Sequence, residues 1–151
     1  MKQISVIGPS NPSEKVGRLA YKIGEIIGDL GFVLICGGRG GVMEQASCGA
    51  KNKGGITVGI LPGDFDDANP CVDIKIPTHM NELRNFLVVS SGNIVVSVGL
   101  SDGTLIELAI AKKLNKTVFS FLLPDTYRHL AKEVFNEQDL DRFKEALLLN
   151  A

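Results

Sequence analysis

Two glycine-containing stretches of the chain have the composition of a small-ligand site. The first, LICGGRGGVMEQA (34–46), contains Gly37, Gly38, Gly40 and Gly41 between an apolar run and a helix-like segment. Glycine permits positive φ and lets a ligand approach the main chain, and free amides at the start of a helix bind anions such as phosphate. Arg39 offers a charge-assisted contact to the same group. The alternative is a tight turn that needs glycine only for its shape.

The spacing of these glycines excludes two common nucleotide motifs. It differs from G-x-G-x-x-G in its dinucleotide-binding context, and no G-K-[ST] follows as in a P-loop. NTPase or kinase chemistry is therefore not expected. The loop after the first expected strand, GPSNPSE, places Ser10 within reach of the same phosphate.

The second stretch, SVGLSDGTLIELA, repeats the arrangement further along the chain. Gly103 and Thr104 precede a helix that Thr104 is expected to cap, with amides that can hold a second anionic or hydroxyl group. Glu107 follows one turn later. It either stabilises the helix dipole or faces the site, where it can orient a water or a ribose hydroxyl or stabilise an oxocarbenium-like centre.

A third candidate side chain is Arg84, after the loop PTHMN. Its planar guanidinium suits bidentate recognition of phosphate or carboxylate. The alternative is a surface arginine paired with Glu82. His79 lies nearby, but a lone histidine carries little functional weight.

Composition limits the classes of partner. Hydrophobic residues make up 44% and charged residues 22% of the 151 residues, as in a globular protein, and the net charge of -1 gives no general attraction to nucleic acid or to membranes. The N-terminal apolar stretch is too short for a secretory signal, so we expect a cytoplasmic protein. Cys36, Cys48 and Cys71 are odd in number and far apart, and we expect small buried thiols, with no disulfide, no metal site and no cofactor.

Apolar runs alternate with segments of helical periodicity along the chain. Expected strands are 3–7, 32–36, 56–61, the run DIKIP, 93–99 and 117–122. Expected helices start at Pro12 with Asn11 as the cap and end at Gly31, then span 42–53, 81–92 and 104–115. After Pro124 the chain reads as mostly helical, with an apolar stripe of Leu140, Phe143 and Leu147.

This alternation predicts an α/β fold: a Rossmann-like, doubly wound, mainly parallel sheet flanked by helices on both faces. We expect residues 1–151 to form a single nucleotide-binding domain, with ligands outside the carboxyl ends of the strands. Apolar helix positions around Leu87, Val88 and 109–111 favour a homodimer or higher homo-oligomer, although they can equally cover the sheet.

At these residues the chain resembles a known family. GGRGGVMEQA is similar to the GGGxxGLMG stretch, and GLSDGTLIE to the PGGxGTxxE stretch, of the lonely-guy (LOG) type nucleoside 5'-monophosphate phosphoribohydrolases, which were long mislabelled as lysine decarboxylases. The resemblance extends to about residue 122. It is strongest to a small uncharacterised bacterial and archaeal branch with a Rossmann-like fold.

The resemblance assigns residues to both motifs. Gly37, Gly38, Gly40, Gly41 and Met43 match the first, and Gly103, Thr104 and Glu107 match the second. Arg84 and Glu107 match the catalytic arginine and glutamate.

Several positions depart from the family's pattern. Cys36 and Glu44 stand where the first motif begins and ends with glycine, and Gly99, Leu100 and Ser101 replace Pro-Gly-Gly. Asn85 replaces a lysine. Phosphate binding at the first loop tolerates these changes better than hydrolysis at the second.

The resemblance implies a nucleotide-binding protein that cleaves the N-glycosidic bond, releasing free base and ribose 5-phosphate. Arg84 would then orient the ribose or the phosphate, and Glu107 would stabilise positive charge at the anomeric carbon. The competing class is the related molybdenum cofactor carrier proteins, which bind a pterin phosphate without cleaving it. A purely structural subunit with no ligand is the third alternative. Lysine decarboxylation is rejected because no Schiff-base lysine with a pyridoxal phosphate site is identifiable.

Overall fold

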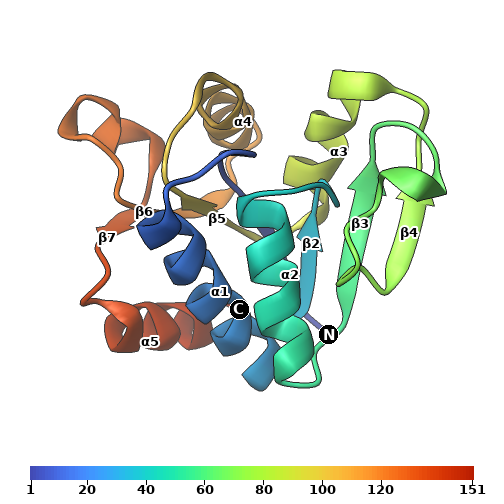
Figure 1. Ribbon diagram of the computed structural model, residues 1–151. Helices are drawn as coiled ribbons and strands as arrows, with labels where there is room; N and C mark the ends of the chain where they lie inside the picture. The colour runs from blue at the N-terminus through green and yellow to red at the C-terminus, as the bar shows by residue number, and fades with distance from the viewer.

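Seven parallel strands form one sheet in the computed structural model, which describes residues 1–151 (Figure 1). The strands are β1 (Gln3–Ile7), β2 (Val33–Cys36), β3 (Thr57–Leu61), β4 (Ile74–Pro77), β5 (Ile94–Val98), β6 (Thr117–Phe121) and β7 (Glu133–Phe135). Their spatial order is β4-β3-β2-β1-β5-β6-β7. The order reverses between β1 and β5, so the connections leave these two strands in opposite directions across the sheet.

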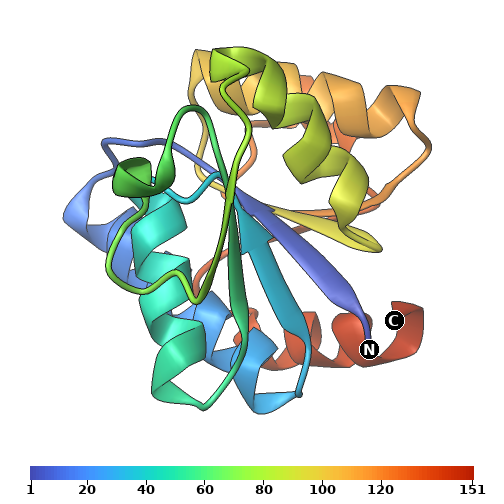
Figure 2. The same cartoon turned by 90° about the vertical axis from the view of Figure 1, so that its right-hand side faces the viewer.

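Five helices cover the two faces of this sheet, which confirms the predicted α/β class. Helices α1 (Glu14–Asp29), α2 (Val42–Asn52) and α5 (Leu140–Asn150) lie on one face, and α3 (Arg84–Ser91) and α4 (Asp102–Lys113) lie on the other (Figures 1 and 2). Three 3-10 turns join them to the strands: Phe65–Asp67, Asn81–Leu83 and Asp125–Leu130.

The central strands are apolar on both faces because helices bury both, whereas the edge strand β4 is exposed. In β1, Ile4 and Val6 pack in the layer under α1, α2 and α5, whereas Ile7 packs in the layer under α3 and α4. Near α5, four fully buried phenylalanines surround one another with ring centroids 4.8 to 6.4 Å apart: Phe119, Phe121, Phe135 and Phe143. Most of these pairs meet edge to face, the geometry that aromatic quadrupoles favour.

Helices α1 and α2 approach each other closely because small residues face each other. A Cβ at Gly24 of α1 would overlap the backbone of Ala46 in α2, and one at Gly28 would lie 2.6 Å from the carbonyl oxygen of Ala50. Only glycine permits this backbone separation. The contact fixes the position of α2, whose N-terminus follows the glycine loop.

The predicted helix caps are wrong at two positions. Helix α1 begins at Glu14 rather than at Pro12, because the Ser13 hydroxyl, not Asn11, accepts a hydrogen bond from the Val16 amide at 3.2 Å. Helix α4 begins at Asp102, and Ser101 rather than Thr104 is its cap. In both cases a serine two or three residues from the predicted cap reaches the free amide three positions on.

The segment after Pro124 is less helical than predicted. A 3-10 turn leads into the short strand β7, which pairs in parallel with β6 through Phe121 and Phe135. Helix α5 follows, and Phe143 and Leu147 are buried as its apolar stripe predicted. The tertiary contact with β6 and the phenylalanine cluster outweighs the weak local pattern of three residues.

The prediction of three free thiols is also wrong. Cys48 and Cys71 form a disulfide, and only Cys36 is free and buried. The two cysteines are 23 residues apart in the sequence. They meet because β2 and β3 are neighbours in the sheet, which brings α2 beside the connection that leaves β3.

None of the helices is both long and apolar enough to span a lipid bilayer.

Candidate functional site

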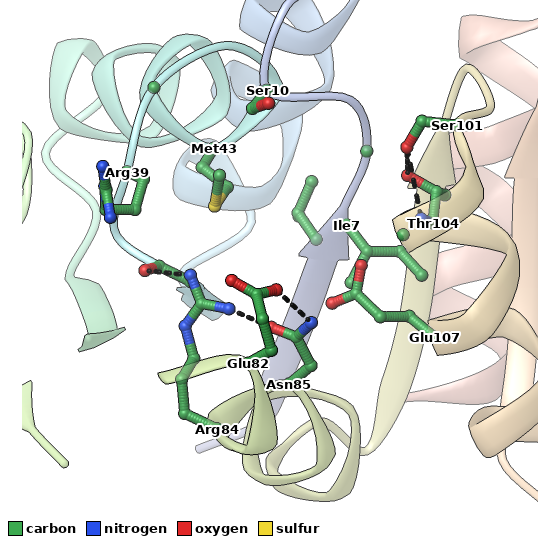
Figure 3. Close-up of a pocket in the computed structure, with 15 residues that line it drawn as sticks. Ile7, Ser10, Arg39, Met43, Glu82, Arg84, Asn85, Ser101, Thr104 and Glu107 are labelled. Carbon is green, nitrogen blue, oxygen red and sulfur yellow. Dashed lines mark hydrogen bonds between the residues drawn. The ribbon is translucent and has the colours of Figure 1, made fainter. Parts of the chain in front are cut away.

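A cavity of about 480 Å³ opens at the carboxyl ends of β1, β2 and β5, where the strand order reverses (Figure 3). Doubly wound sheets bind ligands at this position, because the diverging connections leave a crevice there. The volume suits a small molecule. Val6, Ile7 and Gly8 form the floor, and polar side chains and glycine backbone form the walls.

The first glycine loop divides its glycines between two tasks. Gly37 and Gly40 line the cavity, whereas Gly38 and Gly41 do not. Gly38 has φ +77° and Gly41 has φ +68°, and a Cβ at Gly41 would overlap the carbonyl oxygens of Pro9 and Ser10. The sequence analysis predicted that all four glycines bind the ligand. In the structure, Gly38 and Gly41 shape the turn, and only Gly37 and Gly40 can contact a ligand.

The loop delivers an uncapped helix end to the cavity. Gly41 is the N-cap of α2, and no side chain bonds to the first amides of this helix. Met43, in the first turn, lines the cavity. The Val42 amide donates to the Pro9 carbonyl oxygen at 3.0 Å, so the amides that follow it and the positive end of the helix dipole lie beside Arg39. This is a suitable arrangement for an anionic group.

The second helix end at the cavity is already capped from within the chain. The Ser101 hydroxyl accepts from the Thr104 amide at 3.2 Å and lies 2.9 Å from the Thr104 hydroxyl. Thr104 and Gly103 line the cavity as predicted. A Cβ at Gly103 would meet only the Ser101 hydroxyl, at an ordinary contact distance of 4.0 Å, so its lack of a side chain is not required by the packing.

Arg84 is not a surface arginine paired with Glu82, because only 6% of it is exposed. It is the first residue of α3, and its guanidinium donates to the carbonyl oxygen of Gly37 at 3.4 Å and to the Asn85 side chain. Its Nε is buried without a partner. Burial lowers the pKa of Arg84, but a guanidinium keeps its charge in proteins.

Glu107 faces the cavity from α4 (Figure 3). Of the two alternatives that the sequence allowed, a site residue or a carboxylate that only stabilises the helix dipole, the structure shows the first. Burial raises the pKa of Glu107 to about 7, and the charge of Glu82 adds to this effect while Arg84 opposes it. At neutral pH the carboxyl group is therefore only partly ionised.

The arginines and Glu107 lie on different walls of the cavity. Arg39 and Arg84 lie beside the glycine loop, whereas Glu107 projects from the opposite wall (Figure 3). Glu82 lies between them and accepts a hydrogen bond from the Asn85 amide at 3.3 Å. An anionic group is favoured at the arginine side, and a group with N–H or O–H donors is favoured at the carboxylate side.

Of the predicted site residues, nine line the cavity: Ser10, Gly37, Arg39, Gly40, Met43, Arg84, Gly103, Thr104 and Glu107. Sequence reasoning missed Glu82, Asn85 and Ser101 as site residues. The signal for the first two was their position beside Arg84 in the sequence, and for Ser101 it was a hydroxyl directly before DGT. His79 lies in an exposed loop outside the cavity. No group of three or more His, Cys, Asp or Glu side chains is arranged to hold a metal ion.

The fold and cavity define a Rossmann-like protein with a glycine loop and helix N-termini at a small-molecule cavity. Residues 1–147 match the model of the SLOG cluster4 family, and the chain belongs to this family. The predicted relation to LOG-type proteins is thus confirmed at the level of this LOG-like, Rossmann-type superfamily. Membership of the phosphoribohydrolases stays a prediction.

Three similar proteins cover most of this chain. An uncharacterised protein of Archaeoglobus fulgidus is 47% identical over 124 residues, which is 82% of either chain. The molybdenum cofactor binding protein of Rippkaea orientalis is 32% identical, covers 97% of both chains and superposes with a TM-score of 0.87. The molybdenum cofactor carrier protein of Chlamydomonas reinhardtii is 32% identical, covers 99% of both chains and also has a TM-score of 0.87.

A more distant similarity is to a protein of the same fold that binds DNA. DNA processing protein A of Helicobacter pylori, a protein with a single-stranded DNA binding mode, is 20% identical over 97% of this chain and 80% of that chain, with a TM-score of 0.75. At this identity the similarity concerns the fold alone. The predicted absence of a nucleic-acid partner stays a prediction.

Proposed function

We propose that this protein binds a small phosphorylated ligand in the cavity at the β1–β5 switch point and holds it without cleaving it, as a carrier or sensor. Molybdenum cofactor is the first ligand to test. The observation that carries the proposal is the separation of charge in the cavity: arginines and an uncapped helix end on one side, and Glu107 on the other. The two molybdenum cofactor proteins of the same fold support it.

The cavity suggests how such a ligand lies. Its phosphate would bind beside Arg39 and the amides at the start of α2, where charge and dipole favour an anion. The other end of the ligand would approach Glu107, where a neutral heterocycle with N–H groups finds an acceptor. A nucleoside triphosphate would extend its negative charge toward Glu82 and Glu107, so we expect monophosphate esters to bind more tightly.

Three features favour binding over hydrolysis. A carboxyl group with a pKa of about 7 is only partly charged at neutral pH, which weakens its stabilisation of an oxocarbenium-like centre. Ser101, where the hydrolases have glycine, uses its hydroxyl to cap α4. Asn85, where they have lysine, bonds to Arg84 and to Glu82 and brings no charge of its own.

The second candidate function is nucleoside 5'-monophosphate phosphoribohydrolase activity. It is favoured by one observation: Arg84 and Glu107, the residues that match the catalytic pair of the LOG enzymes, line the same cavity. In this case the fraction of molecules with ionised Glu107 would carry the activity.

The test is a titration calorimetry and turnover experiment on one set of ligands: molybdenum cofactor, nucleoside 5'-monophosphates and inorganic phosphate. The variant Arg39→Ala removes an exposed cavity arginine, so folding is preserved. Its control is Arg18→Ala, an exposed arginine of α1 whose partner is Glu14. We expect Arg39→Ala to weaken binding about tenfold or more, as for loss of a charge-assisted contact, and Arg18→Ala to leave it unchanged.

The same samples separate the two functions. Tight binding with no free base released supports the carrier or sensor. Base release that disappears in Glu107→Gln supports the hydrolase, and the absence of any binding contradicts both.

A further inference from the structure

The Cys48–Cys71 disulfide joins α2, whose first turn lines the cavity, to the connection between β3 and β4, which contacts the glycine loop. Cys48 lies in α2, the helix that begins at the glycine loop, and Cys71 lies near the end of the connection between β3 and β4. Both cysteines are partly exposed, whereas Cys36 is fully buried. A solvent-borne reductant can therefore reach this bond but not the third thiol.

The connection that carries Cys71 also holds the glycine loop. The Asn69 amide donates to the carbonyl oxygen of Gly38 at 2.8 Å, and the Asn69 side chain donates to that of Arg39 at 2.8 Å. The Asn69 side-chain oxygen accepts from the Cys71 amide at 2.9 Å. Asn69 thus connects the disulfide directly to the backbone of the cavity wall.

Little else fixes this part of the connection. Asn69 is the only buried residue between 63 and 71. From Cys71 onward the chain is also anchored by noncovalent contacts, because Thr57 donates to the Cys71 carbonyl oxygen at 2.6 Å and Lys51 pairs with Asp73 at 2.5 Å. The disulfide is the covalent constraint nearest to Asn69, and without it only hydrogen bonds hold Asn69 against the glycine loop.

We propose that the Cys48–Cys71 disulfide is a redox latch that holds the glycine loop in its ligand-binding conformation, so that reduction by a dithiol loosens the loop and weakens ligand binding. The ligand part of this proposal rests on the proposed function. A dithiol protein or small molecule is the reductant.

The chemistry is ordinary thiol–disulfide exchange. A thiolate of the dithiol attacks one sulfur of the pair, a mixed disulfide forms, and the other cysteine leaves as a thiolate. The second thiol of the reductant then closes its own disulfide and releases the first cysteine. Two electrons pass from the dithiol to the protein, and two protons end on Cys48 and Cys71.

The experiment compares oxidised and dithiothreitol-reduced protein. Native alkylation should modify two thiols after reduction and leave Cys36 protected. Amide hydrogen exchange of residues 37–41 should then rise by about fivefold or more, and the dissociation constant for molybdenum cofactor or AMP should rise by a similar factor. Exchange in β5 serves as the reference for global unfolding.

Two variants separate the latch from a general loss of stability. Asn69→Ala keeps the disulfide but removes its connection to Gly38 and Arg39, and in oxidised protein it should reproduce the faster exchange at 37–41. Lys51→Ala removes an ion pair at the same connection but no contact of the glycine loop. It should therefore leave the exchange of residues 37–41 unchanged.

Equal exchange at 37–41 in fully oxidised and fully reduced protein would overturn the latch, as would equal affinity of both forms for a ligand that binds. A third outcome separates the two proposals. If exchange at 37–41 is faster in reduced protein but neither form binds a probe, the disulfide controls the loop and the proposed function is wrong.

Discussion

Replacing Glu107 by glutamine removes the one carboxyl group whose pKa burial raises to about 7. In the unfolded chain this group titrates near 4.5. Between these two values the folded protein holds a proton that the unfolded chain has lost. The stability contributed by the neutral group is therefore fully present below about pH 4.5 and is lost as the pH rises to about 7.

The size of the effect follows from the two values. A pKa difference from 4.5 to about 7 corresponds to about 3 kcal/mol at most. Since Glu107 is only partly buried, solvent screening reduces this to about 1 to 2 kcal/mol. Glu107→Gln, which stays neutral, should match the parent near pH 4.5 and exceed its free energy of unfolding by this amount above about pH 8.

Urea denaturation of both proteins across this pH range, with the disulfide kept oxidised, measures the difference. The control is Glu145→Gln, which makes the same substitution at an exposed position of α5 outside the cavity. If the curves of Glu107→Gln and the parent remain parallel from pH 4.5 to about pH 8, burial does not perturb Glu107 and the electrostatic description of the cavity is wrong.

Three further perturbations have defined outcomes. Gly41→Ala should lower the free energy of unfolding by about 1 to 3 kcal/mol in urea denaturation and abolish ligand binding, because φ is +68° and a Cβ would overlap backbone carbonyls. The control Gly40→Ala, with open space at its Cβ, should fold normally. Equal free energies of unfolding for the two variants would contradict this. Reducing the Cys48–Cys71 disulfide should lower the free energy of unfolding by about 3 kcal/mol, because the bond closes a loop with a separation of 23 residues. Urea denaturation with and without dithiothreitol measures the difference, and an unchanged urea midpoint would refute the prediction. Phe143→Ala should cost about 3 to 5 kcal/mol in thermal or urea unfolding because the ring is fully buried among three others, and a loss below 1 kcal/mol would mean that the cluster is loosely packed.

The order of elements was predictable because each buried strand leaves a continuous apolar run and most helices leave a 3.6-residue period. The exception was β7, whose three residues carry too little local signal and depend on pairing with β6. The exact caps were also missed. Several serine, threonine and asparagine side chains stood near each helix start, and backbone geometry selected Ser13 and Ser101.

The residues of the candidate site were predictable where a motif carried them and not where the fold assembled them. Arg84, Glu107 and the glycine loops could be named from the sequence, but which glycines face the cavity depends on the turn geometry at Gly38 and Gly41. Glu82 joins the cavity only because a 3-10 turn precedes α3.

The Cys48–Cys71 pair could not be inferred from spacing. Its proximity follows from the strand order, because neighbouring β2 and β3 place α2 beside the β3–β4 connection. The contact between Asn69 and the glycine loop could not be predicted from the sequence either, because its hydrogen bond to Arg39 joins residues 30 positions apart.

The most direct test of the central claim is a nuclear magnetic resonance titration of isotope-labelled protein with molybdenum cofactor under anaerobic conditions and, in parallel, with AMP. It follows the backbone amides and the phosphorus signal of the ligand in one sample. We predict saturable shifts of the amides at the start of α2 and in residues 37–41, with the ligand intact for hours. Shifts confined to other surfaces, or conversion of AMP to ribose 5-phosphate, would contradict a binding protein that holds its phosphorylated ligand in this cavity without turnover.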